Sequence, residues 1–200
     1  KLSELAERVR IIPLETKPEC YINAIGRVFV GEKNILVMSP GSKQHLFLFT
    51  LDGKFVRKIG RPGKGPGEYT DIRDISVFEE QNEVYLSTGL RGDMIAYNFD
   101  GSFVRSIRGI QGASESKRIG KYKTAYYSHL DFEIKVVNEK AQDTSGYIPI
   151  DSHYKSPSVN MSGSVHNGFF FSALGKSTIW RFTEDSFQPA IVCDFGSASM

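Results

Sequence analysis

Basic residues recur in short glycine-containing segments that separate the apolar runs of this chain. The longest segment, residues 60–69, reads GRPGKGPGEY. Three others, SPGSKQH, STGLRGD and SALGKST, each combine glycine with a basic residue. If the fold brings these segments to one rim, their charges would favour an anionic or polyhydroxylated ligand. The candidate ligand-binding residues are Arg61, Lys64, Arg91, Lys43 and Lys176.

The segment 60–69 also has a structural interpretation, as a loop that joins two repeats. Its four glycines allow positive φ angles, and its prolines stiffen the path. Glu68 could accept hydrogen bonds from backbone N–H groups, and Tyr69 could pack between repeats. On this interpretation the structural residues between repeats are Gly60, Gly63, Gly65, Pro66, Gly67, Glu68 and Tyr69.

Two carboxylates, Asp71 and Asp74, lie close together just after this segment. Either could face a central channel and bind a cation or a sugar, but carboxylates also satisfy backbone groups where a strand begins. The four histidines, at positions 45, 129, 153 and 166, lack the spacing of a zinc site. No G-x-S-x-G nucleophile motif occurs. We therefore assign no catalytic residue and expect no cofactor, except Ca²⁺ if the protein is an enzyme.

Two similar hairpins indicate the elements that would position these residues. Residues 47–60 read FLFTLDGKFVRKIG, and residues 95–108 read IAYNFDGSFVRSIR. Asp-Gly between alternating apolar runs predicts a two-residue turn in which both residues have positive φ. Weaker copies lie within 132–150 and 178–196. The turns therefore recur about every 44 residues, which is the period of a propeller blade.

The runs AIGRVFV and NILVMS precede the first hairpin, and IRDISVF and EVYLST precede the second. Four antiparallel strands per repeat predict an all-β fold, a β-propeller of four-stranded antiparallel blades. The segment 109–121 is polar and rich in glycine and serine, so we interpret it as a loop in place of a strand. We expect a single propeller domain over residues 1–200, with repeats at 22–60, 70–108, 120–150 and 157–196, and with residues 1–16 as an N-terminal segment that supplies a closing strand to the last blade.

Three parts of the chain carry a family resemblance. They are IIPLET at 11–16, the first hairpin with the following RPGKGPGEYTDIRDISV, and the C-terminal FFFSALGKSTIWRFTEDSFQPAIVCDFG. Together they resemble the six-bladed β-propeller proteins of Bacteroidetes that are related to NHL-repeat propellers. The resemblance implies secretion or lipoprotein anchoring, hence a periplasmic or cell-surface location, and a binding role. It brings no catalytic residues.

The resemblance leaves one discrepancy in size. A ring of six blades at this period needs about 264 residues, whereas four repeats are visible here. The chain is then a fragment, a shortened form, a ring of fewer blades, or a ring completed by another chain. An incomplete ring would expose a strand edge and favour self-association.

Composition limits the function classes. The net charge of +2 does not indicate nucleic-acid binding, and no apolar stretch reaches the ~20 residues of a transmembrane helix. The first ten residues show no signal peptide, which leaves an upstream lipid anchor open. Cys20 and Cys193 lie near opposite ends, where a closed ring could pair them.

Three functions remain. The first, which we favour, is a non-enzymatic extracytoplasmic binding or scaffold propeller that takes a carbohydrate or protein on its loop face. The second is a lyase, lactonase or hydrolase with a carboxylate or Ca²⁺ site at the channel mouth. The third is an assembly component that pairs through open blade edges.

Overall fold

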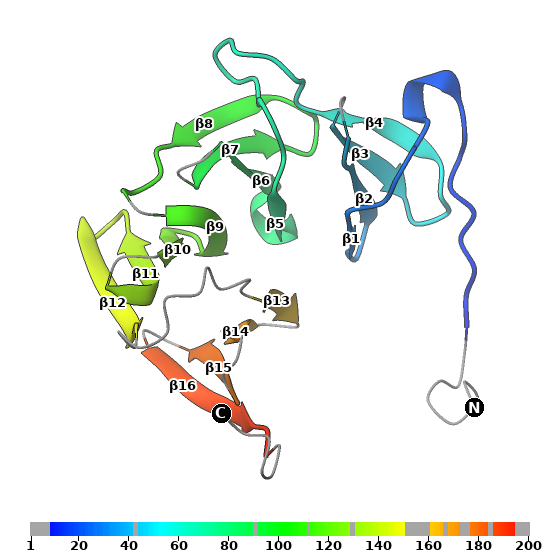
Figure 1. The fold of residues 1–200 in the computed structure, drawn as a ribbon. Helices are drawn as coiled ribbons and strands as arrows, with labels where there is room; N and C mark the ends of the chain where they lie inside the picture. Colours follow the sequence, from blue (N-terminus) through cyan, green and yellow to red (C-terminus); the bar gives the residue numbers. More distant parts are fainter. Residues whose placement is uncertain are drawn as a thin grey trace. The chain divides into compact units, whose positions relative to one another are not determined.

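The computed structural model contains four antiparallel sheets of four strands each, and the strands of each sheet follow one another in chain order (Figure 1). The only helices among the described residues are short 3₁₀ turns, η2 (Pro18–Cys20) and η3 (Glu79–Gln81). The predicted all-β fold of four-stranded propeller blades is therefore confirmed. The structure describes residues 9–41, 44–89, 92–111, 113–128, 131–150, 161–165, 168–172, 177–183 and 186–194.

The four sheets belong to two compact units. The first unit comprises residues 1–89 and 94–107, and the second comprises 90–93 and 108–200. In the first unit, the first sheet is β1 (Arg27–Val30), β2 (Asn34–Ser39), β3 (His45–Thr50) and β4 (Phe55–Ile59), and the second is β5 (Asp74–Phe78), β6 (Glu83–Thr88), β7 (Asp93–Asn98) and β8 (Phe103–Ile107). In the second unit, the third sheet is β9 (Ala113–Gly120), β10 (Lys123–Ser128), β11 (Phe132–Asn138) and β12 (Asp143–Pro149), and the fourth is β13 (Met161–Val165), β14 (Gly168–Ser172), β15 (Thr178–Thr183) and β16 (Ser186–Val192).

The Asp-Gly hairpins have a different turn from the one predicted. Gly53 and Gly101 both have φ of +84°, whereas neither preceding aspartate has positive φ. Gly53 N–H donates to Thr50 O at 2.9 Å, and Thr50 N–H donates to Lys54 O at 2.9 Å. This pattern is a type I turn followed by a left-handed glycine, and the ladder shifts register beside it. The turn therefore needs positive φ only at the glycine.

The core of the first unit lies between its two sheets. Alternate side chains of β2 and β3, including Leu36 and Leu48, pack with Val84 and Leu86 of β6. Tyr69, in the connection between the sheets, joins the same cluster. Fully burying a valine or leucine side chain stabilises a fold by about 1.5–3 kcal/mol. Packing across the sheets is therefore a main source of stability within this unit.

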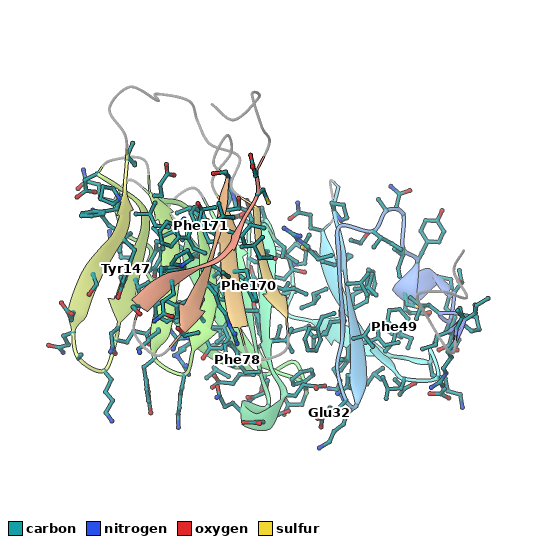
Figure 2. The ribbon with its side chains drawn as sticks, turned by 90° about the horizontal axis from the view of Figure 1, so that it is seen from below. Glu32, Phe49, Phe78, Tyr147, Phe170 and Phe171 are labelled. Atoms are coloured by element: carbon teal, nitrogen blue, oxygen red, sulfur yellow. The ribbon has the colours of Figure 1, made fainter. Side chains whose placement is uncertain are left out.

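The other face of the first sheet packs against the N-terminal segment. Phe47 and Phe49 are buried there with Cys20, and Ile12 and Leu14 pack against them. Figure 2 labels Phe49 of this cluster. Residues 9–16, which we expected to form a closing strand of the last blade, form no strand. They lie along the first hairpin instead, because their apolar side chains cover the aromatic face.

The prediction that the segment 109–121 is a loop in place of a strand is wrong, since residues 113–120 form strand β9. The strand escapes a search for apolar patterns because three of its buried residues, Ser116, Lys117 and Arg118, are polar. Arg118 is 2% exposed and donates from Nη1 to Thr124 Oγ1 at 2.8 Å. It also pairs with Glu139, which lies just after β11. A buried guanidinium held by a carboxylate and a hydroxyl replaces an apolar side chain here.

The core of the second unit is aromatic. Phe171 of β14 stacks on Tyr127 of β10 with ring centroids 5.7 Å apart, and Tyr147 of β12 meets Phe187 of β16 edge-on at 5.2 Å. Such pairs stabilise beyond the area they bury. Figure 2 labels Tyr147 and Phe171 in this unit.

Two further observations concern the cysteines and membrane-spanning helices. Cys20 and Cys193 are both free thiols. No helix in the described part of the chain is long and apolar enough to cross a membrane.

Candidate binding loops of the first unit

The glycine-rich segment forms the start of the connection from β4 to β5, which extends beyond the strands in Figure 1. Backbone hydrogen bonds join the beginning of this segment to its end. Gly63 N–H donates to Tyr69 O at 2.9 Å, and Tyr69 N–H donates to Arg61 O at 3.2 Å. Gly60 and Gly67 have φ of +65° and +70°, which favour glycine at both ends of the loop. The loop therefore holds its shape through its own hydrogen bonds.

The side chain of Glu68 also bonds within this loop. Its carboxylate accepts a hydrogen bond from Gly65 N–H at 2.8 Å and pairs with Arg61 Nε at 2.7 Å. The Gly65 N–H bond and the nearby Arg61 guanidinium together lower the pKa of Glu68. A Cβ at Gly63 would overlap this carboxylate. Arg61 keeps 79% of its side chain exposed despite this pairing, and Lys64 is also exposed.

Two buried tyrosines attach the loop to the sheets. Tyr69 is 1% exposed and donates from its hydroxyl to Gln44 O, just before β3, at 3.1 Å. Tyr97 of β7 donates to Gly67 O at 2.8 Å. Burial raises the pKa of Tyr97 to about 12, with a further contribution from the charge of Glu68. Both phenols are therefore neutral donors at physiological pH.

Asp71 anchors the loop between β6 and β7. One of its carboxylate oxygens accepts hydrogen bonds from Gly89 N–H at 2.6 Å and from Thr88 Oγ1 at 3.0 Å, and the other pairs with Arg73 Nε at 3.0 Å. Burial acts to raise the pKa of Asp71, but these donors and the Arg73 charge outweigh it and lower the pKa. Asp71 thus holds the first residues of the neighbouring loop.

Asp74 lies at the first position of β5 and is 8% exposed. Its Oδ1 accepts a hydrogen bond from Ile75 N–H at 2.8 Å and lies 3.5 Å from Arg27 Nε of β1. The ion pair connects the first strands of the two sheets. Within the part of the chain that the structure describes, no three His, Cys, Asp or Glu residues cluster as metal ligands would.

The connection between the sheets consequently contacts the loops on both sides of it. Tyr69 and the backbone N–H of Ile72 bond to Gln44, before β3, and Asp71 bonds to residues 88 and 89, after β6. Sequence reasoning missed Gln44, Arg73 and Thr88. Their place next to the ends of apolar strands is the signal that could have identified them. Of the predicted ligand-binding residues, Lys43, Arg91 and Lys176 lie outside the described residues.

The first residue of β7 makes a similar contact. Asp93 accepts a hydrogen bond from Gly109 N–H at 2.6 Å. A carboxylate at a strand end again fixes the backbone of a connecting segment. The arrangement can present loops of fixed shape, with exposed cations, to a ligand.

Comparisons with known proteins agree with this architecture. The sequence matches the family DUF4934, a domain of unknown function, over residues 1–200, and the chain belongs to that family. No curated protein matches it.

Two crystal structures of Bacteroides proteins have a similar fold. A "putative exported protein" from Bacteroides fragilis NCTC 9343 is 21% identical and superposes with a TM-score of 0.76 over 92% of this chain and 54% of that protein. A member of the DUF4221 family from Bacteroides vulgatus is 8% identical, with a TM-score of 0.63 over 94% of this chain and 63% of that protein. The chain therefore spans about half the length of the first structure and less than two thirds of the second.

Proposed function

We propose that the protein is a non-enzymatic binding or scaffold propeller that takes a carbohydrate or protein partner at its connecting loops. The observation that carries this proposal is the double anchoring of the β4–β5 connection. Tyr69 and Asp71 tie it to the loops on either side, while Arg61 and Lys64 remain exposed. The backbone of such a loop loses little conformational entropy on binding, so the positions that carry its cations are preorganised for acidic or polyhydroxylated groups.

We also propose that the protein works outside the cytoplasm, as a periplasmic or cell-surface protein with a lipid anchor, and that it forms a six-bladed propeller of the NHL type. Support for the location comes from the structural similarity to the Bacteroides fragilis protein, whose name describes it as exported. Support for the larger ring comes from the four blade-like sheets found here and from the greater length of both similar structures.

A binding screen tests the site. We expect the protein to bind acidic or hydroxyl-rich glycans on an array, and the variant Arg61→Ala with Lys64→Ala to bind at least about tenfold more weakly by calorimetry. Each charge-assisted hydrogen bond lost costs about 1.5–3 kcal/mol, and 1.4 kcal/mol corresponds to a factor of ten. Lys54→Ala is the control, because Lys54 is 78% exposed but lies beside the β3–β4 turn. Equal binding by the double variant and the control would exclude this site.

A further inference from the structure

Phe103 is the first residue of β8, the fourth strand of the second sheet, and is 48% exposed to solvent. The equivalent residue of the first sheet is Phe55, the first residue of β4, which follows the other Asp-Gly turn in the same way. Phe55 is partly buried and meets Phe47 and Phe49 edge-on, with ring centroids 6.3 and 5.8 Å apart. Of these two equivalent phenylalanines, Phe103 therefore presents the larger part of its ring to solvent.

Two neighbours hold the exposed ring in place. Tyr97, its partner across β7 and β8, meets it edge-on, with ring centroids 6.3 Å apart. Gly67 of the β4–β5 connection lies against it, because a Cβ added at Gly67 would be 3.0 Å from both Cγ and Cδ2 of Phe103. Tyr97 also donates from its hydroxyl to Gly67 O at 2.8 Å. The ring thus rests on the backbone of the glycine-rich loop, and this contact favours glycine at position 67 as much as its positive φ does.

The same loop places cations beside the ring. Glu68 directly follows Gly67, and its carboxylate pairs with Arg61 Nε at 2.7 Å, so Arg61 lies at the part of the loop that carries the ring. The Arg61 side chain is 79% exposed, whereas that of Glu68 is 18% exposed and also accepts a hydrogen bond from Gly65 N–H. With Lys64, two cations stand against one carboxylate in this loop. An exposed aromatic ring and an excess of one positive charge therefore lie together on a loop of fixed shape.

We propose that Phe103 and the β4–β5 connection together bind a uronic acid residue of a glycan, with the sugar ring stacked on Phe103 and its carboxylate beside Arg61. The assignment rests on the proposed function and narrows the ligand from a carbohydrate or protein to an acidic carbohydrate. The C–H bonds on one face of a pyranose carry partial positive charge, which the negative face of an aromatic ring attracts. The guanidinium group has the planar fork of N–H donors that matches a carboxylate. One excess positive charge suits a sugar with one carboxylate.

Calorimetry with tetramers of galacturonic, glucuronic and mannuronic acid tests this assignment. We expect at least one tetramer to bind, and its methyl ester, which lacks the negative charges, to bind at least about tenfold more weakly. Phe103→Ala should weaken binding of the same tetramer about tenfold through the loss of stacking, and Phe103→Trp should keep it within about threefold of the unmodified protein. Phe103→Leu keeps the apolar bulk without the aromatic ring, and replaces Phe103→Ala if that variant folds poorly.

Fluorescence provides a second measurement that a merely structural role for Phe103 would not change. The chain contains one tryptophan, Trp180 of β15, so Phe103→Trp in a Trp180→Phe background has a single indole at position 103. We expect saturating tetramer to shift its emission to shorter wavelength, because stacking removes water from the exposed face of the ring. Unchanged emission at saturation would overturn the assignment.

Val28→Ala is the matched control, because Val28 is 53% exposed but lies on β1, at the opposite edge of the first sheet from β4. Its affinity for the tetramer should equal that of the unmodified protein. Full affinity in Phe103→Ala, together with loss of binding in Arg61→Ala with Lys64→Ala, would remove Phe103 from the site and leave the proposed function intact. A protein partner that requires Arg61 and Lys64, with no binding of any tetramer, would have the same consequence. If neither a tetramer nor a protein partner binds, both proposals are wrong.

Discussion

Tyr69 combines two roles, since its ring fills the core between the first two sheets while its hydroxyl bonds to Gln44. We expect Tyr69→Phe to lower the free energy of unfolding by about 1 kcal/mol, because it removes one buried hydrogen bond and leaves Gln44 O without that donor. Urea unfolding followed by far-UV circular dichroism measures the change. Tyr122→Phe is the control, since Tyr122 is 41% exposed and should change stability by less than about 0.5 kcal/mol. Equal effects of the two substitutions would contradict an anchoring role for the Tyr69 hydroxyl.

Asp71 makes the stability of the first unit depend on pH. Its pKa is lowered in the folded protein, so its contribution is present above the unfolded value of about 3.9 and is lost as the pH falls through the lower folded value. We expect Asp71→Asn to cost about 1 kcal/mol at pH 7, because the pair with Arg73, whose side chains are 31% and 32% exposed, is partly screened by solvent. The difference between the two proteins should shrink below about pH 4. Urea unfolding at a series of pH values measures it, and a difference that stays constant down to pH 3 would show that charge is not the cause.

At the scale of elements, the two Asp-Gly hairpins form a natural pair for comparison. Both glycines have φ of +84°, so alanine at either position costs about 1–2 kcal/mol in backbone strain. A Cβ at Gly101 would have its nearest neighbour at 3.6 Å, whereas a Cβ at Gly53 would overlap Pro13 O. We therefore expect Gly53→Ala to destabilise the protein more than Gly101→Ala.

The same comparison reports on the N-terminal segment. Only Gly53→Ala should displace residues 9–16 from the hairpin and speed their amide hydrogen exchange, because Arg10 and Glu15 bond to the first of the two turns. Hydrogen exchange read by mass spectrometry distinguishes the two variants. Faster exchange of residues 9–16 in Gly101→Ala as well would mean that general destabilisation, and not the contact with Pro13, releases the segment.

Strand β9 shows where element prediction from sequence alone becomes unreliable. Runs of consecutive apolar residues identify β2, β3, β6 and β7, because each of these strands buries side chains on both of its faces. In β9 the buried positions include Ser116 and Arg118, and Arg118 bonds to Thr124 and pairs with Glu139. Glu139 lies 21 residues after Arg118. Local sequence contains no sign of that pairing, so the segment resembles a loop.

For the whole molecule, the proposed location makes a simple prediction. Fractionation of cells that produce the protein natively should find it outside the inner membrane, in the periplasm or on the cell surface. Protease added to intact cells then separates the two, since a surface protein is cleaved and a periplasmic protein is protected. Recovery in the cytoplasmic fraction would contradict the proposal, because an exported protein would not accumulate there.

The sequence by itself determined the all-β class, the repeat of four strands and the position of the hairpins. These follow from short apolar runs, some with a period of two, and from turn residues, both of which act within a few positions of the chain. Only the tertiary structure decided that Asp71 and Tyr69 hold loops on opposite sides of one connection, that Arg118 is buried, and that residues 9–16 lie on the first hairpin. Each of these depends on partners tens of residues away or on a neighbouring sheet, so no local pattern specifies it. The sequence shows that the β4–β5 connection contains basic residues. The hydrogen bonds that give this loop its shape, and the exposure of its cations, are found only in the structure.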